Sequence, residues 1–322
     1  MNKYQILWIC LLLIILAFLA LILFIISPNK CSSFIKKIKC YSGSLLDKLI
    51  FPARSCNKYQ YINEKDINYF NVVKKNEKLE QEIQNQNCSS LECKRTVPYA
   101  FLQNEKFKNT KNYVIYFHGN GETIDEASEF VKLLMNQLKF HAFLIEYPQY
   151  GIYNHDVTNA QIILEDSIQA YNRIKEEYKL EDSQILIFGR SIGTGPAIYV
   201  ASQVQCKGLI VISAYRSIIQ QVRGMLFGIG FLVSKFMEER FNNEERISNI
   251  QCPTLYIHGL LDTLIPHTHS IFLNKKQQNS HPESQVKLET FAGMNHNNIS
   301  QFTYEISEKI GFFFEELNKS SH

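Results

Sequence analysis

Glycine, proline and cysteine are all sparse in this 322-residue chain, which contains 14, 8 and 8 of them. So little glycine and proline excludes a collagen-like or generally disordered chain, and so few cysteines at this length exclude a small disulfide scaffold. Cys88 and Cys93 have no neighbouring cysteine or histidine that would indicate a zinc site. These absences leave an ordinary globular protein with a hydrophobic core.

Acidic residues are absent from the first 40 positions, which contain five lysines. Of the 34 basic residues in the chain, 29 therefore lie beyond residue 40, together with all 31 acidic ones. The formal net charge of +3 thus arises from the N-terminus. A domain with this balance lacks the basic surface that binds nucleic acid, so no nucleic-acid partner is predicted.

The longest hydrophobic run covers residues 6–26 without a polar interruption. As a helix it would span roughly 30 Å, the thickness of the hydrocarbon layer of a bilayer. No small-residue cleavage site follows, which favours a retained anchor over a cleaved signal peptide. We predict a single-pass transmembrane anchor over residues 1–30, with the lipid bilayer as its partner.

The charged flanks of this run predict its orientation. One lysine precedes the run and four follow it, so the positive-inside bias places the C-terminal domain in the cytoplasm. Three glycosylation sequons, at Asn87, Asn298 and Asn318, keep a luminal placement open. Cys31 and Cys40 lie beside the predicted membrane and could carry acyl chains or remain free thiols.

The rest of the chain divides at about residue 113. Residues 31–112 are polar and irregular, and we predict a membrane-proximal lead-in with first strands near residues 49–51 and 97–102. Beyond it, expected strands cover residues 113–117, 142–146, 184–188, 209–212, 254–257 and 286–291, and expected helices cover 124–138, 159–178, 194–202, 270–276 and 299–317. Short apolar strands that alternate with helices predict one α/β domain over residues 113–322, with a mostly parallel central sheet and helices on both faces.

A serine stands in Gly189-Arg190-Ser191-Ile192-Gly193, which fits the pattern G-x-S-x-G. The expected strand 184–188 runs directly into it and a helix of small residues leaves it, which is the setting of a nucleophile elbow. Glycines at both ends would allow neighbouring elements to approach while Ser191 adopts a strained backbone. The alternative is a glycine-rich turn without a catalytic role.

A serine nucleophile needs a base and an acid that orients the base. In this setting they follow the serine in the order Asp or Glu, then His. Asp262 comes just after the expected strand 254–257, and His296 just after the expected strand 286–291. All three residues therefore stand at carboxyl ends of strands, where ligands bind in open α/β sheets.

The other histidines fit this role less well. His118 and His258 each precede a glycine at a strand end and are interpreted as structural. His267 and His269 lie in an expected loop and could line the site, while His281 stands in a polar stretch and is expected to be solvated.

Two backbone N–H groups must stabilise the oxyanion that forms on the substrate. The residue after the nucleophile, Ile192, is expected to supply one. The turn His118-Gly119-Asn120-Gly121 reaches the same edge of the sheet and should supply the other, with Asn120 preferred and Gly121 second.

Five stretches carry a resemblance to a known family: YFHGNGE (116–122), IEYPQYG (145–151), ILIFGRSIGTGPA (185–197), YIHGLLDTLIPHTHS (256–270) and FAGMNHNNI (291–299). Through them residues 45–317 resemble the α/β-hydrolase superfamily and, within it, the ABHD17 (FAM108) branch of membrane-associated serine hydrolases. The resemblance implies Ser191 as nucleophile, Asp262 as acid and His296 as base, and removal of palmitoyl groups from protein cysteines. ABHD17 proteins are held by an acylated cysteine-rich N-terminus, whereas the hydrophobic run here is more similar to the ABHD13 branch.

A lid-like insertion is expected at about residues 215–246, between two strands of the sheet. Residues 225–233 within it are nearly continuously apolar. They predict either a cover helix packed on the core or an acyl-chain groove in which Phe227 and Phe231 would bind substrate.

Together these features predict a membrane-anchored serine hydrolase that cleaves acyl esters or thioesters, with protein depalmitoylation as its specific form. Its substrate would be an acylated protein or a small acyl ester, and no metal or organic cofactor is implied. A serine aminopeptidase-like peptidase with the same triad and a non-catalytic membrane scaffold are the alternatives.

Overall fold

The computed structural model describes residues 47, 50, 51, 59–74, 93–225, 231, 234, 235 and 237–319. The hydrophobic run at residues 6–26 and Phe227 of the predicted groove lie outside these residues. Within the part of the chain that the structure describes, no helix combines the length and the apolar character needed to cross a bilayer.

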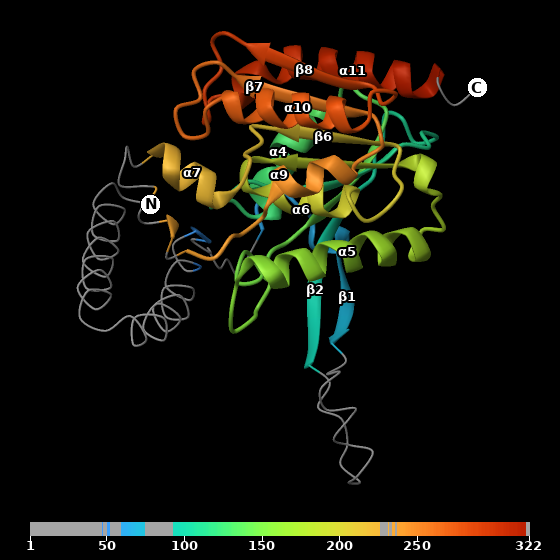
Figure 1. The fold of residues 1–322 in the computed structure, drawn as a ribbon. Helices are drawn as coiled ribbons and strands as arrows, with labels where there is room; N and C mark the ends of the chain where they lie inside the picture. Colours follow the sequence, from blue (N-terminus) through green and yellow to red (C-terminus); the bar gives the residue numbers. More distant parts are fainter. Residues whose placement is uncertain are drawn as a thin grey trace, which may run out of the picture.

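A single sheet of eight strands runs through the domain, with β7 and β8 at the top of Figure 1 and β1 and β2 at the bottom. The strands are β1 (Ile67–Lys74), β2 (Cys93–Leu102), β3 (Tyr113–Phe117), β4 (His141–Ile145), β5 (Ile185–Arg190), β6 (Gly208–Ile212), β7 (Thr254–Gly259) and β8 (Val286–Phe291). Their order in the sheet is β1-β2-β4-β3-β5-β6-β7-β8. β1 and β2 run antiparallel to their neighbours, whereas β3 to β8 are parallel. The predicted α/β class with a mostly parallel sheet is confirmed.

Helices cover both faces of the sheet. The α-helices are α4 (Ile124–Met135), α5 (Ala160–Glu177), α6 (Thr194–Ala201), α7 (Ile218–Met225), α9 (Asn243–Arg246), α10 (Thr268–Ser280) and α11 (Thr303–Lys319). Short 3₁₀ helices are η1 (Glu64–Asp66), η2 (Asp182–Gln184), η3 (Ser191–Gly193), η4 (Ile247–Asn249) and η5 (Ile299–Phe302). Helices α5, α6 and α10 pack into the core on one face, and α4 and α11 into the core on the other. Successive strand residues alternate between these cores, as Val114 and Ile115 of β3 do.

Side-chain caps fix the helix starts that follow the strands. Thr123 and Glu126 form a capping box at the start of α4, where the Thr123 hydroxyl accepts from Glu126 N–H and the Glu126 carboxylate accepts from Thr123 N–H. Asn159 caps α5 by accepting from Ile162 N–H at 2.9 Å. Such caps satisfy backbone donors that the first helical turn leaves free.

The first strands differ from the sequence prediction. The strand expected near residues 49–51 is wrong, because Asp47 and Ile50 are helical and Phe51 N–H donates to Asp47 O at 2.8 Å. Strand β1 was not predicted, although Phe70 and Val72 are buried while Asn71 between them and Tyr69 before them are exposed. The strand expected at residues 97–102 is confirmed as part of β2, and the sheet begins at residue 67, within the predicted lead-in.

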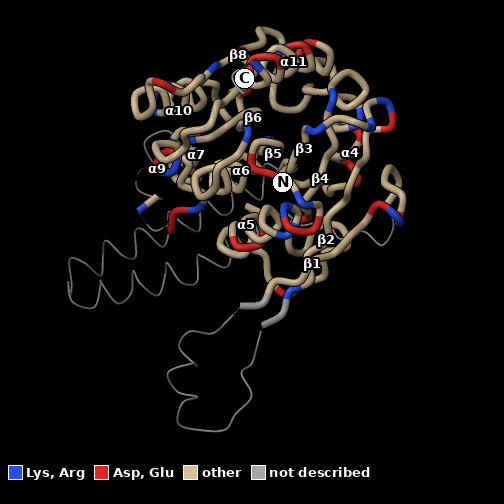
Figure 2. The backbone as a smooth tube through the Cα atoms, turned by 90° about the vertical axis from the view of Figure 1, so that its right-hand side faces the viewer, with Lys and Arg blue, Asp and Glu red and all other residues tan. Residues whose placement is uncertain are grey.

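Lys and Arg residues are interspersed with Asp and Glu residues over the described chain (Figure 2). One buried cluster of opposite charges ties the antiparallel strands to the helical layer. Arg95 of β2 donates to Asp166 and Glu165 of α5 at 2.9 and 3.0 Å, and Tyr153 OH donates to Asp166 at 2.8 Å. Because Arg95 and Asp166 are almost fully buried, removing either would leave an uncompensated charge in the core.

Candidate active site

The turn between β5 and α6 holds Ser191 in an unusual backbone conformation. Ser191 has φ of 54°, in the left-handed region that non-glycine residues rarely adopt. The flanking glycines allow this turn to pack closely: a Cβ on Gly193 would lie 2.1 Å from Phe117 O, and one on Gly189 would lie 2.4 Å from Gly193 O. The expected reason for both glycines is confirmed, and the turn presents the Ser191 hydroxyl at the carboxyl end of β5.

Three residues that are far apart in the sequence meet above the carboxyl ends of β5, β7 and β8. Ser191 Oγ lies 2.9 Å from His296 Nε2, and His296 Nδ1 lies 2.8 Å from Asp262 Oδ2. Because a carboxylate can only accept, His296 Nδ1–H donates to Asp262, and Nε2 is then free to accept from the Ser191 hydroxyl. This arrangement can withdraw a proton from Ser191 and stabilise the imidazolium that results.

The Asp262 carboxylate is buried within a shell of donors. Its Oδ1 accepts from the N–H groups of Leu264 and Ile265 at 3.0 and 2.8 Å. Burial by itself would raise the pKa of Asp262, but hydrogen bonds from His258 and His296 outweigh it and hold that pKa well below its ordinary value. Asp262 therefore stays ionised, as an acid that orients a histidine must.

His258 contributes to this shell although its sequence position indicated only a structural role. Its Nε2 lies 3.5 Å from Asp262 Oδ2 and 2.8 Å from Ile265 O, and its Nδ1 lies 2.7 Å from Ser270 Oγ. The signal that could have indicated this contact is the spacing of His258 and Asp262, four residues apart across a strand end.

The turn after β3 places its backbone amides next to the elbow. Among the residues that the structure describes, no acceptor bonds to the N–H of Asn120 or Ile192. The Asn120 side chain is held in place, because Tyr150 OH donates to its Oδ1 at 2.8 Å and its Nδ2 donates to Ile50 O at 2.6 Å. The assignment of Ile192 and of Asn120, with Gly121 second, as the oxyanion donors stays a prediction.

An ion pair links this turn to the elbow, and sequence reasoning missed it. Glu122 accepts from Gly119 N–H at 2.5 Å, and Arg190 Nη1 lies 3.1 Å from both Glu122 carboxylate oxygens. Arg190 directly precedes Ser191, and Gly119 directly precedes Asn120. The Arg190–Glu122 pair thus connects the residue before Ser191 to the turn that carries Asn120.

Beneath the same turn, His118 is fully buried and has acceptors at both ring nitrogens. Its Nε2 lies 3.0 Å from Glu146 Oε1, and its Nδ1 lies 2.9 Å from Gly119 O. Burial opposes the charged ring, but the Glu146 carboxylate outweighs it and raises the pKa of His118. His118 therefore supports the turn from below, which fits its interpretation as a structural residue.

Phe231, one of the two predicted substrate-binding phenylalanines, makes no ring contact with Ser191, Asp262 or His296 among the described residues. Phe231 is 58% exposed, and its ring lies beside the cations of Arg223 and Lys235 at 5.2 and 5.0 Å. Phe227 lies outside the described residues. Exposed leucines instead flank the acid of the triad: Leu260, Leu261 and Leu264.

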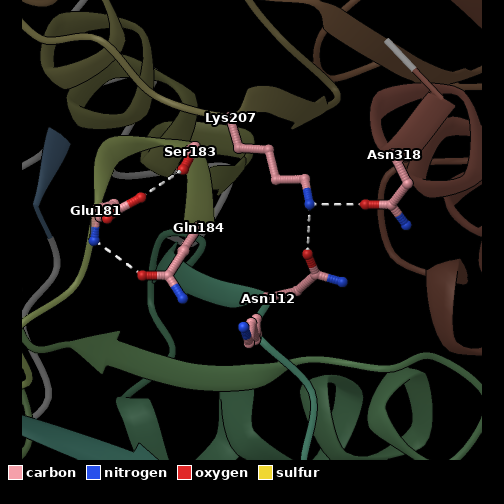
Figure 3. A pocket seen from close by; sticks show the side chains of 7 residues that line it. Asn112, Glu181, Ser183, Gln184, Lys207 and Asn318 are labelled. Carbon is pink, nitrogen blue, oxygen red and sulfur yellow. Dashed lines mark hydrogen bonds between the residues drawn. The ribbon is translucent and has the colours of Figure 1, made fainter. Parts of the chain in front are cut away.

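A polar cavity of about 520 Å³ lies at the amino ends of the central strands β3, β5 and β6, away from Ser191 (Figure 3). Lys207 reaches between two amides and donates to Asn112 Oδ1 at 2.7 Å and to Asn318 Oδ1 at 2.8 Å. The cavity is lined by Lys111, Asn112, Glu181, Ser183, Gln184, Lys207 and Asn318. None of the predicted site residues contributes to it.

His269 belongs to the first turn of α10 rather than to a loop, and its buried position predicts a pH-dependent contribution to stability. Its Nδ1 accepts from Arg216 N–H at 3.1 Å, and burial, followed by the Arg216 charge, lowers the pKa of His269 to about 4. In the unfolded chain this histidine has a pKa of about 6.5. Between about pH 6.5 and pH 4 it is therefore protonated in the unfolded chain but neutral in the folded one. This contribution is complete above about pH 6.5 and is lost as the pH falls toward 4.

We expect His269→Asn to remove part of this pH dependence. Asparagine can accept from Arg216 N–H without titrating. Between pH 7 and pH 4.5 the free energy of unfolding should therefore fall by about 2 kcal/mol less in the variant than in the native chain. Urea unfolding at both pH values measures the difference. Equal losses in the two proteins would show that His269 does not titrate in this range.

The comparisons with known proteins agree with this geometry. No family model matches the chain. Human α/β hydrolase domain-containing protein 17B is 25% identical over 209 residues, which cover 65% of this chain and 68% of that protein. The α/β hydrolase domain-containing protein aho-3 of Caenorhabditis elegans is 24% identical over 199 residues, or 61% of this chain and 58% of that protein. The chain thus spans less than two thirds of the length of the nematode relative.

Among solved structures, the Pyrococcus furiosus esterase Pf2001 aligns with a TM-score of 0.58 at 15% identity, covering 82% of this chain and 97% of that one. The chain therefore has the α/β-hydrolase fold, as its motifs predicted. Its curated relatives include α/β hydrolase domain-containing proteins 17B and 17C, so the predicted resemblance is confirmed.

Proposed function

We propose that this chain is a serine hydrolase that cleaves acyl esters or thioesters at a membrane. The observation that carries the proposal is the chain of hydrogen bonds from Ser191 through His296 to Asp262. The α/β-hydrolase fold and the relatives named for it support the same class of enzyme.

The proposed reaction begins when Ser191 Oγ attacks the acyl carbonyl and His296 Nε2 accepts its proton. Asp262 stabilises the imidazolium, and the N–H groups of Ile192 and Asn120 bind the oxyanion. His296 then gives the proton to the departing alcohol or thiol, which leaves an acyl-enzyme. A water molecule, deprotonated by His296, hydrolyses this intermediate and restores Ser191.

Protein depalmitoylation is the specific form that we propose. The hydrophobic run at residues 6–26 would hold the site close to a bilayer, where S-acylated proteins are anchored. The exposed leucines beside Asp262 offer apolar surface for an acyl chain as it leaves the lipid.

The preference for acyl-chain length tests this substrate class. Burial of each methylene contributes about 0.8 kcal/mol, so kcat/KM for a series of acyl thioesters should rise up to about fourfold per added methylene until the groove is full. If the acyl chain also reaches the lid-like insertion, as the sequence predicts, Phe231→Asp should flatten this rise and leave acetyl-ester turnover largely intact. Phe312→Asp, at an equally exposed phenylalanine of α11, is the matched control and should leave the rise unchanged. A flat series together with efficient cleavage of aminoacyl amides would favour the peptidase instead.

The anchor has a separate test. The full-length chain should remain in the membrane pellet after a carbonate wash, and deletion of residues 1–30 should release at least part of it, because the deleted segment contains the entire hydrophobic run. Protease added to sealed vesicles reports which side the hydrolase domain faces. A glycosidase-sensitive shift in mobility would contradict the cytoplasmic placement.

A further inference from the structure

Two thiols touch just before the amino ends of the neighbouring strands β6 and β7, at the end of the sheet opposite Ser191. Cys206 lies two residues before β6, and Cys252 lies two residues before β7. Both are free cysteines, and their Sγ atoms are 3.4 Å apart, with Cys206 as the donor. This separation is a van der Waals contact between sulfurs that no covalent bond joins.

The surrounding backbone holds the two thiols in this position. Leu209 pairs with Thr254 in the parallel ladder, and Leu209 N–H donates to Pro253 O at 2.9 Å. A disulfide requires sulfurs about 2.0 Å apart, so each need move only part of the remaining distance of about 1.4 Å. Side-chain rotation on two fixed, adjacent strand starts can supply such a movement.

We propose that Cys206 and Cys252 form a reversible redox site that a small-molecule disulfide, such as oxidised glutathione, converts to an intramolecular disulfide. The Cys206 thiolate attacks one sulfur of the oxidant, which releases one small thiol and leaves a mixed disulfide on Cys206. The Cys252 thiolate then attacks Cys206 Sγ and releases the second small thiol. The two protein thiols lose two electrons and two protons, and the oxidant becomes two thiols.

Exposure agrees with this order of steps. Cys206 is partly exposed and can meet the oxidant, whereas Cys252 is buried and can meet only Cys206. The hydrogen bond to Cys252, together with burial, raises the pKa of Cys206. Few thiolates are therefore present at neutral pH, and oxidation should accelerate as the pH rises.

Oxidation would close a covalent ring around residues 207–251, which include β6, α7, α9 and the lid-like insertion. A ring of this size restricts the unfolded chain, and we expect the Tm to rise by about 5–10 °C. The ring closes at the amino ends of β6 and β7, at the end of the sheet away from Ser191, Asp262 and His296. Ester turnover should therefore change little. The proposal does not depend on the proposed function.

The test uses the full-length chain in detergent, incubated with oxidised glutathione at pH 8, blocked with N-ethylmaleimide, digested and analysed by mass spectrometry. We expect a cross-linked peptide pair that contains Cys206 and Cys252 and disappears after reduction. In Cys252→Ser, Cys206 should instead retain glutathione, because the resolving thiol is missing. In Cys206→Ser, Cys252 should remain unmodified, because it is buried.

Two results would overturn the proposal. One is recovery of separate maleimide adducts on Cys206 and Cys252 after oxidation of the native chain. The other is an unchanged or lower Tm in the cross-linked protein, which would mean that the sheet does not accept the bond without strain. Reduction of the same sample provides the matched reference for the Tm.

Discussion

Replacing Ser191 with alanine should abolish turnover of p-nitrophenyl acetate by the full-length chain. Without the hydroxyl there is no nucleophile for His296 to activate, and kcat should fall by roughly 10⁴–10⁶-fold. His296→Ala should cost nearly as much, because the base is lost. Asp262→Asn should cost about 10⁴-fold, since an amide no longer holds the imidazole in the tautomer that accepts at Nε2. Initial rates at saturating substrate measure all three losses.

The structure offers a matched control for the loss of a hydroxyl. Ser213 also has φ of 54°, is buried, and stands at the carboxyl end of the neighbouring strand β6. Ser213→Ala should leave turnover near that of the native chain, and a fluorophosphonate probe should label both the native chain and this variant. Near-normal turnover in Ser191→Ala would exclude Ser191 as the nucleophile. Absence of both turnover and labelling in the native chain would favour the non-catalytic scaffold.

The sequence predicted best those strands that are buried on both faces. Residues 185–188 of β5 are apolar at every position, because helices cover both sides of the sheet there. β1 lies at the edge and alternates instead: Phe70 and Val72 are buried while Tyr69 and Asn71 are exposed. Within a strongly charged stretch such an alternation of a few residues is a weak signal, and β1 was missed for that reason.

Short apolar runs carry too little information to separate a helix from a strand. The strand expected near residues 49–51 failed on this point, because the bond from Phe51 N–H to Asp47 O closes a helical turn. The hydrophobic run at residues 6–26 is long enough to predict its element type, although it lies outside the described residues.

Those residues of the candidate site that directly follow a strand could be predicted from the sequence. Ser191, Asp262 and His296 each come just after a parallel strand, so the topology alone brings them to one edge. Arg190 and Glu122 gave no such signal, because their ion pair joins positions 68 residues apart and depends on side-chain direction. His258 was similarly interpreted only as structural, since its contact with Asp262 depends on how the strand end turns.

We expect Glu122→Ala to lower kcat by about 10–100-fold with little change in KM. Glu122 accepts from Gly119 N–H, and the next peptide carries the Asn120 N–H that the proposed mechanism directs at the oxyanion. Loss of one oxyanion donor costs about 10²–10³-fold, and a displaced donor should cost somewhat less. The substrate is held by other groups in its ground state, so KM should change little.

Conservative variants separate this positioning role from a general loss of stability. Glu122→Gln keeps an acceptor for Gly119 N–H but loses the charge that pairs with Arg190, so its kcat should lie between those of the native chain and Glu122→Ala. Arg190→Lys keeps a cation but not the guanidinium that contacts both carboxylate oxygens, and it too should retain more activity than Arg190→Ala. Glu129→Ala, at an exposed carboxylate of α4, is the control for charge alone.

Two readouts then decide whether Glu122 acts through the oxyanion turn. The rate of labelling by a fluorophosphonate depends on the same N–H donors and should fall in parallel with kcat, while the Tm of Glu122→Gln stays near that of the native chain. Unchanged kcat in Glu122→Ala would show that Asn120 is held without the ion pair. In that case Tyr150, which donates to the Asn120 side chain, and His118, which supports the turn from below, would suffice to position the donor.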